Sequence, residues 1–298
     1  MIPINADANL LDAGTSSVLG RRTMLRALGA TVVSLAAGSA RATSQAGICS
    51  FGVFPYLPAL KIGDLYAPAA VDLGEALGTQ IQLQTKDTFE EFAEELEAGS
   101  YDFVLVHPFL YLAAQERQGY RPIARIDQQL RAVLVGRSEH PVERLTQLRG
   151  ETIAMVPLTA VAELLRATAL DEGLTIGRDL QLAAHQTKMS CLQSAASAEA
   201  VGCVIPSTLG DQLPEVAKLN LVPIWQSEPI CSHVVAVHPR MPGAAVERLQ
   251  QRLIGWTETA AGVDILHRLS WPRLVPATDA DFEPIRTLAA RLRAASTG

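Results

Sequence analysis

Cysteine is the side chain of this sequence with the widest chemistry, and four cysteines follow residue 42. They are Cys49, Cys191, Cys203 and Cys231. None belongs to a C-x-x-C pair, so their spacing does not favour a zinc site. In an oxidising compartment, four cysteines allow three complete disulfide pairings. Each could instead be a small buried apolar residue. The sequence leaves these alternatives open.

Helix geometry bears on one of these pairings. Cys191 lies near the start of an expected helix over 189–200, and Cys203 starts the strand that follows. About nine helical residues lie between the two ends of that unit, which is roughly 13 Å at the standard helical rise. A disulfide needs Cα atoms within about 7 Å. We therefore expect Cys191 and Cys203 not to be bonded to each other unless the helix is broken.

Catalytic patterns are missing from the chain beyond residue 42. It contains no GxSxG, HExxH, P-loop or GxGxxG motif. The neighbouring carboxylates at 90–91 and 94–95 fall on one exposed face of an expected helix, where their ordinary role is solvation. The sequence thus predicts a protein that is not an enzyme and that carries no cofactor and no metal.

Composition and charge narrow the class of partner. Hydrophobic residues make up 48% of the 298 residues and charged residues 19%, which is enough apolar material for a sizeable core. The net charge is −6, and the first 42 residues hold four arginines and two aspartates, which leaves −8 for the rest. An acidic body without a basic run argues against a nucleic-acid partner. It does not exclude a small anion, because one local site can oppose the global field.

The N-terminal region carries an export signal. Residues 20–26 read GRRTMLR, which is similar to the twin-arginine export motif, and an apolar stretch over 27–37 follows. Residues 40–42 read ARA, a small-x-small cleavage pattern. The alternative is a membrane anchor, but about 11 apolar residues fall well short of the roughly 20 that span a bilayer. We expect cleavage after Ala42 and delivery to the periplasm by the twin-arginine route.

Strand-like and helix-like segments alternate after the signal, which is typical of parallel sheets covered by helices. The pattern restarts near residue 131, so we expect two α/β lobes, with 43–131 plus 232–298 as lobe 1 and 132–231 as lobe 2. The expected strands are 49–54, 80–84, 102–106, 131–135, 152–156, 202–205, 221–225 and 233–238, and the expected helices are 62–77, 88–96, 108–118, 158–170, 189–200, 244–256, 262–269 and 282–292.

Five short motifs follow one another in a fixed order: FGVFPYLP at 51–58, LYAP at 65–68, LGTQI at 77–81, AGSYDF at 98–103 and LRGETIA at 148–154. Together they resemble the phosphate/phosphonate-type substrate-binding proteins of ABC transporters. The likeness runs from about residue 50 to residue 238. The resemblance implies a type II periplasmic binding fold, in which two lobes close on a small anion. Helix N-termini facing the cleft would suit an oxyanion.

Three aromatic residues of lobe 1 are candidate ligand contacts under this resemblance. Tyr56 matches a tyrosine that contacts the ligand in the family, although it could be a turn residue that covers the core. His107 precedes a helix and could donate to an anion, or it could be a buried histidine bonded to backbone. Tyr111 lies one turn later and could line the cleft or serve in packing.

Two hydroxyl residues of lobe 2 mark departures from the family pattern. Thr159 is the only hydroxyl residue in 157–160, where the family has several Ser or Thr residues that bind the anion. Ser207 stands where the family often has an aspartate, and it could replace that residue or simply begin a helix. Losing the aspartate removes a carboxylate that would accept from an amine or a protonated phosphonate.

A third departure lies at the start of the helix near 189. Met189 stands where the family often has histidine, and a thioether is a poor ligand for a hard oxyanion. Lys188 could supply charge or be a solvated surface lysine. Ser190 could be an N-cap.

Two binding functions follow from the resemblance. The first is capture of a phosphate-, phosphite- or phosphonate-like oxyanion by a monomer that delivers it to an ABC permease. The second is a sensor that reports its ligand to a membrane histidine kinase. Some relatives of this family bind arsenite in that role, and Cys191 or Cys231 near the cleft would suit such a soft ligand. The sequence does not choose between the two partners.

Overall fold

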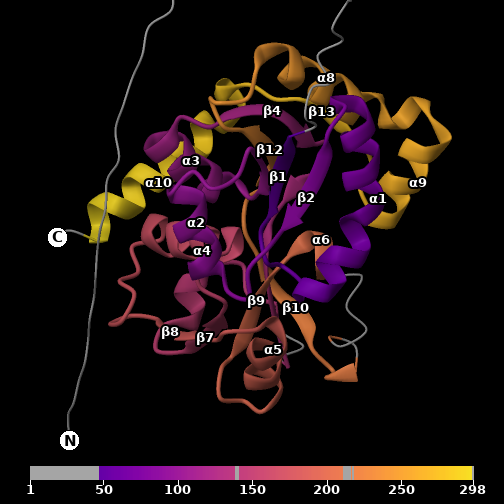
Figure 1. Cartoon of the computed structure of the whole chain (residues 1–298). Coiled ribbons are helices and arrows are strands. Elements are labelled where there is room, and N and C mark those ends of the chain that lie inside the picture. The colour runs from indigo at the N-terminus through magenta and orange to yellow at the C-terminus, as the bar shows by residue number, and fades with distance from the viewer. Residues whose placement is uncertain (1–46, 138–140, 211–215, 217, 297–298) are drawn as a thin grey trace, which may run out of the picture. The chain divides into compact units, whose positions relative to one another are not determined.

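The computed structural model describes residues 47–137, 141–210, 216 and 218–296 (Figure 1). All of them belong to one structural unit, 44–298. The expected export signal at 1–42 lies outside the described residues. Among the helices of the described part, none is long and apolar enough to cross a lipid bilayer.

The first sheet has six strands in the order β13-β4-β12-β3-β1-β2. β1 is parallel to β2 and β3, whereas β12 is antiparallel to β3 and β4, and β13 is antiparallel to β4. Its strands are β1 Ile48–Val53, β2 Gln80–Gln84, β3 Phe103–Val106, β4 Arg121–Ile126, β12 Val234–Val237 and β13 Leu274–Pro276. The accompanying helices are α1 Ala59–Leu77, α2 Phe89–Glu97, α3 Pro108–Gln118, α8 Gly243–Ile254, η2 Gly255–Glu258, α9 Ala260–Leu269, η3 Asp279–Phe282 and α10 Glu283–Ser296.

The second sheet has five strands in the order β10-β6-β9-β7-β8. β7 is parallel to β8 and β9, and β6 is antiparallel to both β9 and β10. Its strands are β6 Ala132–Gly136, β7 Thr152–Met155, β8 Gln181–Ala184, β9 Gly202–Pro206 and β10 Val222–Gln226. The helices are η1 Leu145–Leu148, α4 Ala160–Asp171, α5 Lys188–Ala196 and α6 Ser207–Gly210.

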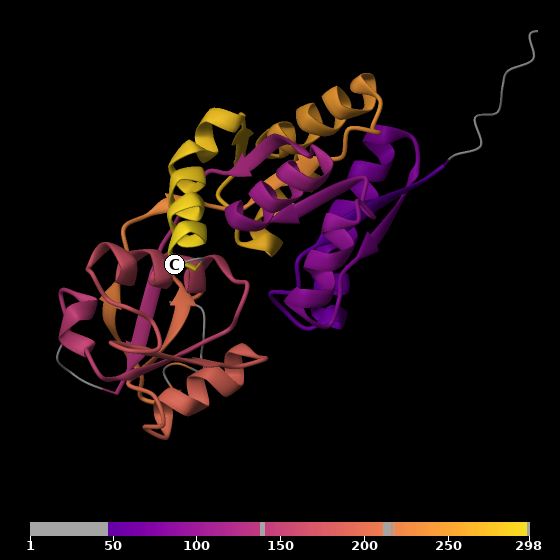
Figure 2. The same cartoon turned by 90° about the vertical axis from the view of Figure 1, so that its left-hand side faces the viewer.

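Two short strands lie on the chain segments that connect the sheets. β5 (Gln129–Leu130) precedes β6, and β11 (Ile230–Cys231) follows β10 and precedes β12. The two strands pair antiparallel, so the outgoing and returning segments are hydrogen-bonded to each other. Helix α10 adds a second link, because it packs against both α3 and α4 and its Arg291 pairs with Asp171 of α4 at 2.6 Å (Figure 2).

Local capping explains where several helices begin. The Thr88 side chain accepts from the Glu91 amide at 3.2 Å and caps α2, as its sequence pattern predicts. Pro108 takes the first position of α3, where its missing N–H would have no helical partner. Helix α1 ends at Gly78, whose φ of 67° lies in the left-handed region that glycine adopts without steric cost.

The expectation about one disulfide is wrong, because Cys191 and Cys203 are bonded, with their Cα atoms 5.5 Å apart. Helix α5 ends at Ala196, four residues earlier than predicted, so only five residues follow Cys191 within it. That distance is about 7.5 Å along the axis rather than roughly 13 Å. The helix also packs directly on β9, which brings its first turn over Cys203. Cys49 and Cys231 remain free thiols.

Three strands of the two large sheets were not predicted from the sequence: β4, β8 and β13, the last of which is only three residues long. β4 contains Pro122 and two arginines, a composition that argues against an interior strand. It is accommodated beside β12 by a register shift between Val235 and Ala236. β8 is four residues long and only half-buried, so its apolar signal is weak.

Candidate functional site

The carboxyl ends of parallel strands in both sheets carry most of the predicted site residues. β1 and β3 lead into Tyr56 and His107, whereas β7 and β9 lead into Thr159 and Ser207. One hydrogen bond joins the two sets: His107 Nε2 lies 2.8 Å from the carbonyl oxygen of Leu158. Strand ends of the two sheets therefore meet at this point, which is where open α/β folds bind ligands.

His107 is held as a neutral imidazole. Its Nδ1 accepts from the Leu110 amide at 3.3 Å and caps α3, which leaves Nε2 to carry the hydrogen donated to Leu158. The side chain is 2% exposed, and this burial lowers the pKa of His107 to about 4, with the Leu158 carbonyl opposing the shift. Both ring nitrogens are thus committed to backbone groups, one from each sheet.

The Leu158 backbone is unusual for a branched residue. Its φ of 56° lies in the left-handed region, which costs an L-residue about 1–2 kcal/mol. Leu158 is also 38% exposed despite its apolar side chain. The turn at the end of β7 therefore holds a strained leucine whose carbonyl accepts from the opposite sheet.

Aromatic rings surround His107 on the side of the first sheet. Phe54 stacks between Tyr56 and His233, with centroid distances of 5.0 Å and 4.9 Å, and meets His107 edge-on at 6.0 Å. Burial, together with the neighbouring His107, lowers the pKa of His233 to about 3. This edge of the first sheet is therefore aromatic and carries two uncharged imidazoles at neutral pH.

The two predicted tyrosines bond to partners in elements that accompany the first sheet, α1 and η3. Tyr56 Oη lies 3.0 Å from Tyr66 Oη, and burial raises the pKa of Tyr56 to about 12. Tyr111 donates to Asp279 Oδ1 at 2.5 Å and packs on Phe282, so it fastens α3 to η3. Burial raises the Tyr111 pKa as well. Tyr56 thus belongs to the aromatic edge around Phe54, whereas the hydroxyl of Tyr111 is directed to η3.

On the second sheet, the predicted hydroxyl residues cap helices. Thr159 Oγ1 accepts from the Ala162 amide at 3.3 Å and donates to the Val156 carbonyl at 2.8 Å. Ser190 and Thr187 form a reciprocal capping box at the start of α5. Beside them Lys188 is half-buried, and the Met189 side chain is 41% exposed.

Ser207 is coupled to an arginine that the sequence analysis passed over. The Arg131 amide donates to Ser207 Oγ at 3.1 Å, and the Ser207 amide donates to the Arg131 carbonyl at 2.9 Å. The guanidinium of Arg131 donates from Nη1 to the carbonyl of Ser227 at 2.8 Å. The only available signal was an arginine at the first position of an expected buried strand, which is an unusual place for a charge.

Comparison with known proteins assigns the chain to a family. Residues 51–282 match the family model described as the periplasmic substrate-binding protein of phosphonate ABC transporters. The chain belongs to this family. Phosphonate-binding proteins act in the periplasm, bind small anionic ligands and work with ABC permeases; they are substrate-binding proteins, not enzymes. A comparison with curated protein sequences found no match.

Several solved structures share the fold of this chain. PhnD1 from Prochlorococcus marinus, solved with methylphosphonate, has a TM-score of 0.74 at 10% identity, covering 83% of this chain and 98% of that one. A phosphonate-transporter binding protein from Pseudomonas aeruginosa has a TM-score of 0.69 at 14% identity, with 84% and 87% covered. XAC2383 from Xanthomonas citri, bound to ATP, has a TM-score of 0.70 at 15% identity, with 84% and 98% covered. The fold is thus the type II periplasmic binding fold.

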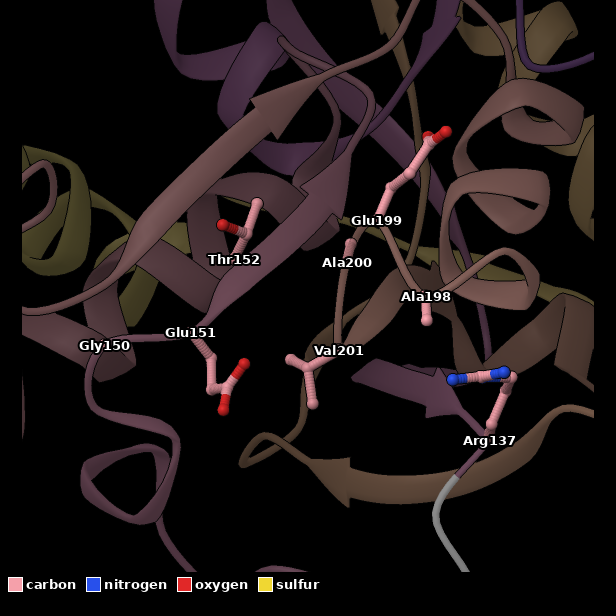
Figure 3. Close-up of a pocket in the computed structure, with 8 residues that line it drawn as sticks. All are labelled: Arg137, Gly150, Glu151, Thr152, Ala198, Glu199, Ala200 and Val201. Atoms are coloured by element: carbon pink, nitrogen blue, oxygen red, sulfur yellow. The ribbon is translucent and has the colours of Figure 1, made fainter.

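A surface pocket of about 600 Å³ lies elsewhere on this phosphonate-binding family member (Figure 3). It is lined by Arg137, Glu151, Glu199 and neighbouring backbone at the amino-terminal ends of β7 and β9. These are the opposite ends of the strands from those that carry the predicted residues. The pocket also shares no residue with the eight predicted ligand contacts.

Proposed function

We propose that this protein captures a small phosphorus oxyanion, of the phosphonate, phosphite or phosphate type, and delivers it to an ABC permease. The observation that carries the proposal is the bond from His107 to the Leu158 carbonyl. It joins strand ends of the two sheets, and strand ends are where open α/β folds bind ligands. The ligand would bind between these strand ends.

The chemistry of the surrounding groups supports an anion. α3, α4 and α5 begin at this edge, and the first amides of each helix have no partner within the helix. Such amides and the helix dipole favour negative charge. The buried imidazole of His107 carries no charge of its own, and its one N–H is already donated to the Leu158 carbonyl. Thr159 and Ser190 place hydroxyl groups beside the same helix starts.

The lobes and the route to the periplasm are part of the proposal. Residues 43–131 with 232–298 would form one lobe and 132–231 the other, and the paired β5 and β11 would be the hinge. The twin-arginine signal would export the folded protein, which would act as a monomer after cleavage at Ala42. Replacing both Arg21 and Arg22 by lysine should keep the protein in the cytoplasm when cell fractions are compared.

The test is ligand binding by the mature protein, residues 43–298. We expect methylphosphonate or phosphite to raise the melting temperature, while sulfate does not. A ligand at about 100 times its Kd stabilises by roughly 2.7 kcal/mol, which moves the midpoint of a domain this size by several degrees. Titration calorimetry would then give the Kd. Absence of any shift with phosphonate, phosphite and phosphate would overturn the proposal.

The alternative is an arsenite sensor that reports to a histidine kinase. The state of the four cysteines supports it less well than oxyanion capture. Cys191 is consumed by its disulfide with Cys203. Burial raises the pKa of the Cys231 thiol to about 11 and that of Cys49 to about 12, so neither supplies a thiolate at neutral pH. Adding arsenite to the same screen, with and without reductant, distinguishes the two: a shift with arsenite alone would favour the sensor.

A further inference from the structure

We propose that Arg131 is the residue that binds the charge of the ligand, with Ser207 as its hydroxyl partner. The inference rests on the proposed function and names residues of the same site. Neither the motifs of the sequence nor the resemblance to the family points to an arginine at this position.

Arg131 lies where the hinge enters the second sheet. It follows β5 directly and precedes β6. Its amide donates to Ser207 Oγ, and its carbonyl accepts from the Ser207 amide. Ser207 directly follows β9. Because β9 is parallel to β7, Ser207 and the Leu158 turn lie at the same edge of the sheet. Arg131 therefore lies at the same edge of the second sheet as the Leu158 turn, which contacts His107.

Arg131 is half-buried, yet its guanidinium donates to a neutral carbonyl. Within the described part of the chain, no carboxylate lies within 4.0 Å of it, whereas Arg125, Arg252 and Arg273 each pair with aspartate. Partly buried charges in proteins are normally paired. The bond to Ser227 uses one of five N–H donors and orients the remaining fork.

The chemistry of the pair suits a deprotonated oxyanion. A guanidinium donates two parallel hydrogen bonds to phosphate-type oxygens, which gives both charge and geometry. Ser207 Oγ accepts from the Arg131 amide, so its own hydrogen can donate to the same oxyanion. The resemblance puts an aspartate at position 207, and a serine beside an arginine reverses the local charge preference. The pair thus selects for negative charge, and a dianion gains more from it than a monoanion.

The experiment is titration calorimetry of methylphosphonate and phosphite with the mature wild type, Arg131→Gln, Arg131→Lys and a control, Arg137→Gln. Arg137 follows the other end of β6 and lines the pocket of Figure 3, away from the strand ends. We expect R131Q to weaken binding by about 10- to 100-fold, since a charge-assisted hydrogen bond is lost. R131K should recover part of this, because it keeps the charge without the fork. R137Q should bind as the wild type does.

A second readout separates charge recognition from a structural role in the hinge. Affinity is measured across the pH range in which the ligand takes its second negative charge. In the wild type it should rise with ligand charge, and in R131Q this rise should flatten. Equal binding by R131Q and wild type, or an equal loss in R131Q and R131K with an unchanged pH profile, would overturn the inference and leave the proposed function standing. A wild type that binds no phosphorus oxyanion would overturn both.

Discussion

The strand ends of the two sheets are built from different side chains. On the first sheet, Phe54, Tyr56, His107 and His233 form a packed aromatic edge, and both imidazoles are held neutral by burial. On the second sheet, the helices α4 and α5 begin with hydroxyl caps, and Arg131 lies beside Ser207. The first edge thus carries packed rings and uncharged imidazoles, whereas the second carries helix amides, hydroxyl caps and a guanidinium. The following predictions test this division.

The largest expected effect concerns the neutral state of His107. Its pKa falls from 6.5 in the unfolded chain to about 4 in the fold. As pH falls from about 6.5 to about 4, His107 binds a proton in the unfolded chain but not in the native protein. Native stability therefore decreases over this window. The shift corresponds to between about 3 and 4 kcal/mol. Above about pH 7 His107 is unprotonated in both states, so this loss of stability is absent.

His107→Asn isolates this effect, because asparagine can cap α3 without titrating. Urea unfolding at several pH values should show a shallower loss of stability in the variant than in the wild type. His267→Asn is the matched control, since His267 is exposed on α9. If H107N and wild type lose stability in parallel down to pH 4, the first edge does not depend on a neutral imidazole.

The next effect belongs to the second sheet and its disulfide. The Cys191–Cys203 bond joins residues 12 positions apart in the chain. Removing it should lower the free energy of unfolding by about 3 kcal/mol. The double variant Cys191→Ala with Cys203→Ala tests this by urea unfolding, and hydrogen exchange should show weaker protection in α5 and β9 than in β3.

Cys231→Ser serves as the control for the disulfide variant, because Cys231 is a free thiol. Reductant should lower the wild-type and C231S midpoints and leave the double variant unchanged. A wild type insensitive to reductant, or a uniform loss of protection in both sheets, would contradict a stabilisation confined to the second sheet.

The smallest effect comes from a single cap on the second edge. Thr159→Ala removes the oxygen that accepts from the Ala162 amide, which should cost about 1 kcal/mol of stability. Thr159→Ser keeps that oxygen and should lose little. Urea unfolding measures both, and calorimetry with methylphosphonate asks whether the hydroxyl also contacts ligand. Equal stability of T159A and wild type would show that the cap is dispensable.

Sequence patterns with local causes predicted much of this protein. The alternation of strand and helix, the cap at Thr88 and Pro108 at the start of α3 each depend on residues a few positions apart. The ordered motifs over residues 50–238 identified the family, which the match over 51–282 confirms. Such features can be predicted from the sequence because the residues that interact lie within one element or in neighbouring elements.

Tertiary structure alone decided the features that join distant residues. Tyr111 is hydrogen-bonded to Asp279, which lies 168 positions later in the chain. His107 is hydrogen-bonded to Leu158, 51 positions later and at the end of a strand of the other sheet. The Cys191–Cys203 bond depended on where α5 ends and how it lies on β9. Arg131 meets Ser207 because β6 and β9 pair antiparallel. No local preference encodes these partners, because each contact arises from the packing of whole elements, and a shift of a few residues in one boundary changes which side chains meet.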